Sequence, residues 1–275
     1  MVHRRKIASL GSAVLLATSA LMLTTSPAQA ATQAKVSVLH GVPGATVDVY
    51  VNGDALLENF EPGTLTDPVS LDPGSYDLKV VEAGAGADGD AVVEANDVEV
   101  PAGANITVVA HLDADGSPKL TPFVNDVSKV DAGKARLTVR HTAAAPAVDV
   151  RAGGDPVFTD LTNPNEDSAV VDAGTVEADV VLAGTDTVAI GPASLNLAEG
   201  TSTIVYAWGS AEDENLKLAV QTISGLHSAP GGVPGGTGGQ AAGADPLLLG
   251  LLGVAAAGLL FSGARLARRK VTVAE

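Results

Sequence analysis

Apolar and polar residues alternate along several short stretches of the chain. In VSVLH (36–40) and TVDVYV (46–51), every second residue falls on the same face of an extended chain, and β-branched residues are frequent. This two-residue period is typical of half-buried β-strands. Turn signals separate the stretches, and Asn52-Gly53 favours a tight hairpin because both residues accept positive φ. No stretch within 35–225 has the pattern of a helix, so the pattern predicts an all-β fold.

The strand pattern occurs twice. VSVLHGVPGATVDVYVNGD (36–54) aligns without a gap with LTVRHTAAAPAVDVRAGGD (137–155). Later segments of the two halves align in the same order with little drift, which indicates a tandem duplication. The alignment superimposes three pairs of residues: His40 with His141, Asp48 with Asp149, and Gly53 with Gly154.

Each repeat is expected to hold about seven or eight short strands in about 100 residues, which predicts an immunoglobulin-like β-sandwich. The expected domains are residues 31–130 and 131–227, and a small barrel is the alternative architecture. The chain contains no cysteine, so disulfides and Cys-ligated metals are excluded. Units of this size are large enough to be stabilised by a hydrophobic core.

The two ends of the chain predict an exported, anchored protein. Residues 1–30 have a basic start, an apolar middle and a small-residue end, as in a secretory signal peptide. Residues 228–245 are rich in Gly and Pro and predict a flexible stalk. Residues 246–264 are uncharged and close to the roughly 20 that a transmembrane helix needs. The basic tail 265–275 is then cytoplasmic, and the domains are extracellular on a single-pass cell-membrane protein.

Charge limits the partners of the exported part. The chain has 32 Asp and Glu against 16 Lys and Arg, for a net charge of −16, and several of the basic residues lie in the signal peptide and the tail. So acidic a surface excludes nucleic acid, which requires clustered Lys and Arg. Aromatic residues make up only 3% of the chain, which weakens a carbohydrate-binding interpretation based on ring stacking.

The repeated motif resembles a known family. A strand ending in His, a Pro- and Ala-rich turn, an A-V-D-V strand and a Gly-containing hairpin are similar to the family called domain of unknown function 4397. HTAAAPAVDVRAGG (141–154) is the closer match, whereas HGVPGATVDVYVNG (40–53) has Gly-Ala-Thr in place of Ala-Pro-Ala. The resemblance covers about 35–225 and implies an exported bacterial protein, often with this domain in tandem. The low Lys content, the Ala-rich signal and the anchor with its basic tail are typical of actinobacterial proteins. The resemblance implies no activity and no catalytic residues.

The repeated polar residues have a structural and a functional interpretation. His40 and His141 are candidates for a metal ligand or a general base, but a metal site needs several converging ligands, and the alignment repeats no second histidine. We therefore expect each ring to bond a turn carbonyl. Asp48 and Asp149 are expected either to pair with the histidine or to fasten a loop through backbone N–H groups. Gly53 and Gly154 are expected in tight turns.

Two acidic loops, 83–91 and 112–119, are candidate calcium sites because calcium prefers clustered oxygen ligands. Neither matches the EF-hand pattern, and we expect both to be solvated loops. The chain has no nucleophile elbow, phosphate loop, dinucleotide fingerprint or H-E-x-x-H motif. No metal, cofactor or catalytic residue is predicted.

These observations predict a membrane-anchored, non-enzymatic surface protein that presents two sandwich domains for binding or spacing. The expected partners are the membrane, through the C-terminal helix, and a protein or other component of the cell envelope. Two alternatives stay open: an envelope hydrolase with an acid-based site, and a calcium-stabilised adhesin.

Overall fold

The computed structural model describes residues 32–228, which lie in one compact unit ending at Ser228. Their regular structure consists of sixteen β-strands. Among these residues there is no helix with the length and apolarity needed to cross a membrane. The predicted signal peptide (1–30), the transmembrane segment (246–264) and the tail (265–275) lie outside the described residues, as does the predicted stalk beyond its first residue.

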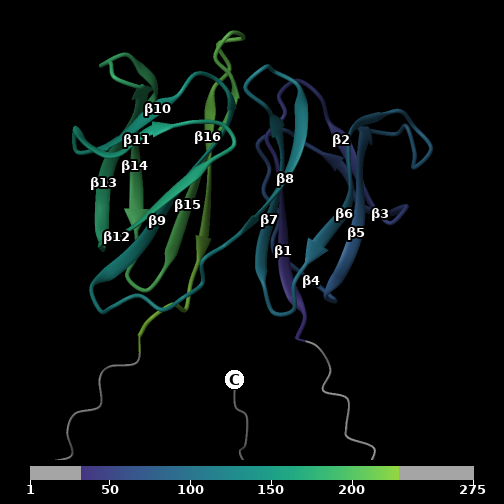
Figure 1. Ribbon diagram of the computed structural model, residues 1–275, viewed down its shortest axis with the longest axis horizontal. Helices are drawn as coiled ribbons and strands as arrows, with labels where there is room; N and C mark the ends of the chain where they lie inside the picture. The colour runs from purple at the N-terminus through teal and green to yellow at the C-terminus, as the bar shows by residue number, and fades with distance from the viewer. Residues whose placement is uncertain (1–31, 229–275) are drawn as a thin grey trace, which may run out of the picture. The chain divides into compact units, whose positions relative to one another are not determined.

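The first eight strands form two four-stranded sheets, of order β4-β1-β7-β8 and β3-β2-β5-β6 (Figure 1). Within these sheets β1 and β7 are parallel, and the other described pairs are antiparallel. The strands are β1 (Ala34–His40), β2 (Val47–Val51), β3 (Asp54–Phe60), β4 (Val69–Leu71), β5 (Gly74–Glu82), β6 (Ala91–Val100), β7 (Asn105–Leu112) and β8 (Pro118–Val124).

The second eight strands repeat this arrangement, with sheets of order β12-β9-β15-β16 and β11-β10-β13-β14. Here β9 and β15 form the parallel pair. The strands are β9 (Lys134–Ala144), β10 (Val148–Ala152), β11 (Asp155–Leu161), β12 (Glu166–Asp172), β13 (Gly174–Leu182), β14 (Val188–Leu197), β15 (Ser202–Ser210) and β16 (Lys217–Ile223).

Each half is thus a sandwich of two sheets, and the all-β prediction is confirmed. The strand order differs from that of an immunoglobulin constant domain, whose sheets read ABED and CFG. Here β1 lies between β4 and β7 instead of beside β2. Alternation and turn signals show where strands occur, but they do not determine which strands pair, and so the topology did not follow from them.

The core of each sandwich lies between its two sheets. In the first sandwich, Val38, Val47, Val49 and Phe60 pack together, as the alternation predicts for the valines. The corresponding cluster of the second sandwich includes Val139, Val148, Val150 and Phe158. The segment 125–133 joins β8 of the first sandwich to β9 of the second.

The two sandwiches also pack against each other through the sheets that contain β1 and β9. As a result β7 and β15 are buried on both faces. One apolar cluster combines residues of both halves: Leu39, Val109 and Phe123 from the first, and Ile204, Tyr206, Trp208 and Ala219 from the second. Ser37 and Leu39, which alternation alone leaves on the outer face, are 1% and 0% exposed.

Trp208 of β15 fits against two glycines of the first sandwich. A Cβ at Gly63 would lie 2.7 Å from Cζ2 of Trp208, and one at Gly41 would lie 3.2 Å from its Cβ. The absence of side chains at these two positions therefore makes room for the indole. The contact holds one sandwich against the other.

Polar residues extend this interface. Arg140 is 1% exposed, and its Nε lies 2.6 Å from Oε2 of Glu166. Its Nη1 donates to the hydroxyl of Tyr206 at 2.7 Å. Its guanidinium lies 4.5 Å from the centre of the Phe123 ring, which belongs to the first sandwich. The buried charge is thus paired and stacked, as a charge in a protein interior must be.

The joining segment is fastened to the second sandwich. Nη1 of Arg136 donates to the carbonyls of Asp126 and Ser128 at 3.2 and 3.0 Å. Val130 forms a parallel bridge with His227, and Lys129 donates to the carbonyl of Gly225 at 2.7 Å. These bonds restrict rotation between the two halves.

Candidate functional site

Asp48 of β2 fastens a bulge and a loop in the first sandwich. Its Oδ1 accepts a hydrogen bond from the backbone N–H of Asn59, and its Oδ2 accepts one from Gly84, both at 2.8 Å. Asn59 has a φ of 54°, and the register between β2 and β3 shifts beside it. The carboxylate therefore stabilises a backbone conformation that L-residues rarely adopt.

Asp149 makes the same two contacts in the second sandwich. It accepts from the N–H groups of Asp160 and Gly184, both at 2.9 Å, and Asp160 also has a φ of 54°. These two backbone bonds lower the pKa of Asp149 because they favour the charged carboxylate. Of the two roles foreseen for the aspartates, the structure shows loop fastening and no bond to the repeated histidine.

The two histidines bond turn carbonyls. Nε2 of His40 lies 2.8 Å from the carbonyl oxygen of Ala45, and Nε2 of His141 lies 2.9 Å from that of Pro146. Each ring is 1% exposed. Burial is the main cause that lowers the pKa of both rings, and the carbonyl bond opposes it in part. Both rings are therefore neutral at neutral pH, with the proton on Nε2.

The second ring nitrogen differs between the copies. Nδ1 of His141 accepts from the N–H of Ala143 at 3.4 Å, whereas Nδ1 of His40 has no hydrogen-bond partner among the described residues. The His40 ring also stacks on Phe60, with ring centres 5.8 Å apart. An imidazole in such surroundings has one unused acceptor and no neighbouring carboxylate to activate it.

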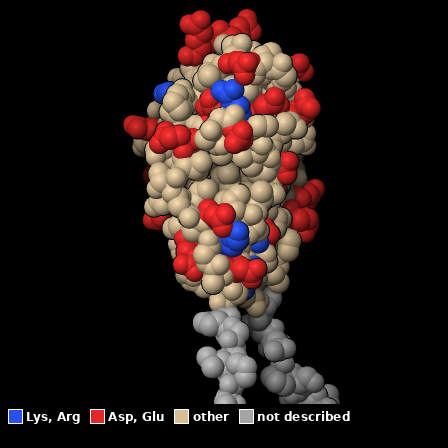
Figure 2. Space-filling view, turned by 90° about the vertical axis from the view of Figure 1, so that its left-hand side faces the viewer, with Lys and Arg blue, Asp and Glu red and all other residues tan. Residues whose placement is uncertain are grey.

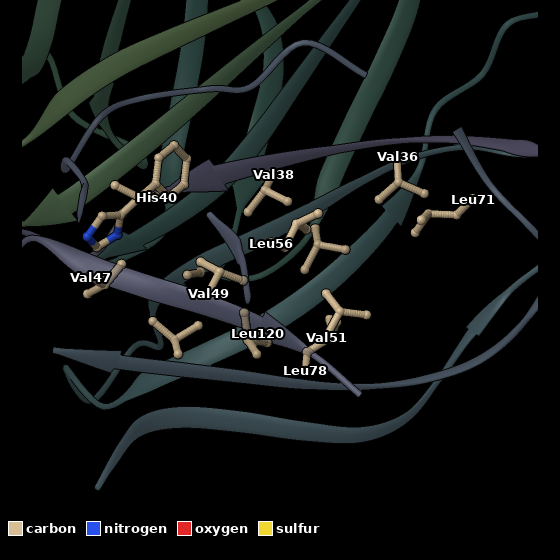
Figure 3. Close-up of a pocket in the computed structure, with 14 residues that line it drawn as sticks. Val36, Val38, His40, Val47, Val49, Val51, Leu56, Leu71, Leu78 and Leu120 are labelled. Carbon is tan, nitrogen blue, oxygen red and sulfur yellow. The ribbon is translucent and has the colours of Figure 1, made fainter. Parts of the chain in front are cut away.

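An apolar pocket lies between the sheets of the first sandwich, with His40 at one end and Leu71 at the other (Figure 3). Its volume is about 40 Å³, and His40 is the only polar residue among the described residues that line it. A space of this size admits water or a few atoms but no substrate of ordinary size. The pocket therefore gives no support to a catalytic role for His40.

The repeated glycines occupy hairpin turns. Asn52 and Gly53 have φ values of 52° and 88°, and Gly153 and Gly154 have values of 63° and 92°. Two successive positive φ angles define the type I′ turn that suits a right-twisted hairpin. Gly53 and Gly154 thus connect β2 to β3 and β10 to β11.

Of the two acidic loops, 112–119 uses a carboxylate oxygen internally. Oδ1 of Asp113 accepts from the N–H groups of Asp115 and Ser117 at 3.0 and 2.9 Å. Within residues 32–228, no group of three or more His, Asp or Glu side chains is placed to hold a metal ion.

Sequence reasoning missed the residues that join the sandwiches. Arg140, Tyr206 and Gln221 are buried in this interface, but their counterparts in the first repeat are Leu39, Val109 and Phe123. Repetition therefore gave no sign of them. The one signal in the sequence was the charge of Arg140 at a position where the first repeat has the apolar Leu39.

The fold and its repeated motif define a class of tandem β-sandwich proteins. Residues 34–151 match the model of the family described as Domain of unknown function (DUF4397), which is the family that the motif resembles. The match covers the first sandwich and ends within β10, after His141 and Asp149 of the second copy. The resemblance expected over about 35–225 is confirmed for this part. No curated protein matches the chain.

Proposed function

We propose that this protein is a membrane-anchored, non-enzymatic protein of the cell surface that presents two immunoglobulin-like sandwiches for binding or spacing at the envelope. The signal-peptide pattern of residues 1–30 and the apolar run 246–264 support export and anchoring. Sandwich architecture without the immunoglobulin strand order is shared by many surface modules, which supports this class.

The main support for a non-enzymatic role is that the repeated carboxylates are already bonded to the backbone. Asp48 and Asp149 each accept two backbone N–H bonds, one on each oxygen. A carboxylate that is held in this way supports a turn and is poorly placed to exchange protons with a substrate. His40 and His141 likewise bond a turn carbonyl in both copies.

The arrangement of the strands supports presentation on a stalk. The N-terminal end of β1 and the C-terminal end of β16 lie at the same end of the two-sandwich unit, and the loop between β15 and β16 lies at the opposite end (Figure 1). An anchor that follows β16 would leave those far loops exposed. The packed interface keeps both sandwiches in one orientation.

Topology in intact cells tests the proposal. We expect protease added to cells that express the full chain, tagged after Glu275, to digest the sandwiches and leave the tag on a membrane-bound fragment. Lysed cells, in which the tag is also digested, provide the control. A chain whose sandwiches are protected in intact cells, or a chain released into the medium, would contradict the proposal.

A further inference from the structure

A polar groove lies between the two sandwiches. Its volume is about 360 Å³. One wall consists of residues 65–68, just before β4, and the other of residues 220–224, at the end of β16. Ser37 of β1 and Asn105 of β7 complete the lining. The groove thus requires both sandwiches in their packed arrangement.

The groove follows the free edge of a sheet. Among the described residues, β16 is the last strand of its sheet, and β15 is its only partner there. Successive side chains of a strand point to opposite faces, yet five consecutive residues, 220–224, line the groove. The groove therefore contacts the edge of the strand, where alternate backbone N–H and C=O groups have no partner strand.

The polar side chains of the lining have fixed orientations. Gln221 is 8% exposed, and its Oε1 accepts from Thr107 at 2.9 Å and from Tyr206 at 2.6 Å. Oδ1 of Asn105 accepts from Asn125 at 2.7 Å. Because both amide oxygens are occupied, the amide nitrogens of Gln221 and Asn105 are left to donate hydrogen bonds.

The lining excludes several classes of ligand. Among the described residues that line the groove there is no Lys or Arg to hold an anion and no aromatic ring to stack a sugar or a base. Asp67 is its one charged residue, and it favours a cation. The chain carries 32 Asp and Glu against 16 Lys and Arg, and Figure 2 shows this acidic excess on the side of the second sandwich that faces away from the first. The net negative charge of the protein favours a basic partner.

We propose that this groove binds an extended peptide with a basic side chain, which adds a strand to the free edge of β16. Its backbone pairs with β16, the amides of Gln221 and Asn105 donate to its carbonyl oxygens, and Asp67 attracts the basic side chain. Backbone pairing of this kind gives affinity, and neighbouring side-chain contacts give specificity. The inference rests on the proposed binding role and gives it a partner class.

The first test selects, from a peptide library, those peptides that bind the full-length protein. The probe is a phage-displayed library of random linear dodecapeptides, and the best peptide is then synthesised. We expect enriched peptides to contain Lys or Arg. We expect Asp67→Asn to weaken binding of the synthetic peptide about tenfold, as for one lost charged contact. Asp88→Asn, in an exposed loop outside the groove, is the matched control and leaves binding unchanged.

Backbone methylation of the peptide tests strand addition without altering the protein. Methylating alternate backbone nitrogens on one edge of the peptide abolishes binding, whereas methylating the opposite set has a smaller effect, because only one edge pairs with β16. Failure to enrich peptides, equal effects of both methylation patterns, or binding insensitive to Asp67→Asn would overturn the proposal. None of these outcomes affects the protease test of surface presentation, so the peptide proposal and the surface proposal can be contradicted independently.

Discussion

Thr107 and Gln221 are 114 residues apart in the chain, yet the Thr107 hydroxyl donates to Oε1 of Gln221 at 2.9 Å. The bond crosses from β7 of the first sandwich to β16 of the second. It belongs to a buried series in which Tyr206 also donates to Gln221 and Arg140 donates to Tyr206. The two repeats therefore share one interior, although each has the strand order of a complete domain.

The contact between Gly63 and Trp208 gives the first prediction. Gly63→Ala introduces a Cβ 2.7 Å from the indole and also places an alanine at a φ of +83°. Gly53→Ala meets the same backbone strain at φ +88°, but nothing lies within 4 Å of its Cβ. We expect Gly63→Ala to lower the free energy of unfolding by about 1–3 kcal/mol more than the control, as for overpacking. Urea denaturation measures the difference, and equal losses would contradict the role of this contact.

The Tyr206 hydroxyl gives the second prediction. Tyr206→Phe leaves a buried N–H of Arg140 without its acceptor and removes a donor to Gln221, which costs about 1–3 kcal/mol. Tyr76→Phe is the control, because the Tyr76 hydroxyl donates to the carbonyl of Asp72 at an exposed site, where water replaces it. We expect a measurable loss in thermal unfolding only for Tyr206→Phe. A similar small effect of both changes would show that the buried series contributes little.

The repeated aspartates give the third prediction. In the native protein, each carboxylate oxygen accepts a hydrogen bond from a backbone N–H. In Asp48→Asn or Asp149→Asn, the new amide nitrogen faces one of these N–H groups and cannot accept its hydrogen bond. We expect Asp48→Asn, at a carboxylate that is only 5% exposed, to lower the free energy of unfolding by about 1–3 kcal/mol. Asp149→Asn, at a more exposed carboxylate, should lower it in the same direction. Asp54→Asn, at the exposed start of β3, is the control with an expected change below about 0.5 kcal/mol. Unchanged stability in both variants would contradict the fastening role.

Acid provides the fourth prediction. Burial is the largest cause that lowers the pKa of His40, His111 and His141. The unfolded chain, with an ordinary pKa of about 6.5, then binds more protons than the folded chain below that pH. Stability is therefore complete above about pH 6.5 and falls as the pH decreases, until the folded histidines also titrate.

Unfolding temperatures measured from pH 7.5 to pH 5 test this expectation. His111→Gln, which retains hydrogen-bonding groups but cannot be protonated, should make the dependence shallower. Ordinary carboxyls, with pKa values of about 4, remain mostly ionised at pH 5, so they contribute little to a loss above that pH. An unfolding temperature that stays constant or rises as the pH decreases from 7.5 to 5 would contradict the burial of neutral histidines.

The sequence predicted the local structure of each sandwich and missed what joins the two. The valines of VDV face the core, and the Asn52-Gly53 turn connects two strands, because side-chain period and turn chemistry are local properties. The pairing of β1 with β7 and the burial of Ser37 are long-range properties. No pattern within one repeat indicates that a second repeat will cover its outer face.

The same limit applied to the candidate site. The sequence repeat identified His40 and Asp48 as candidates. The structure shows that each side chain forms a hydrogen bond with a nearby backbone group. Gln221 and Asn105 line the groove, yet neither belongs to the repeated motif. Only the packing of β16 beside β1 and β7 brings them together.

Calorimetry of the full-length chain tests most directly whether the two sandwiches form one unit. Because they share the apolar cluster and the buried series around Tyr206, we predict a single unfolding transition for residues 32–228, with equal calorimetric and van't Hoff enthalpies. Gln221→Ala should lower the midpoint of that one transition. Two separate transitions, only one of which responds to Gln221→Ala, would contradict the account.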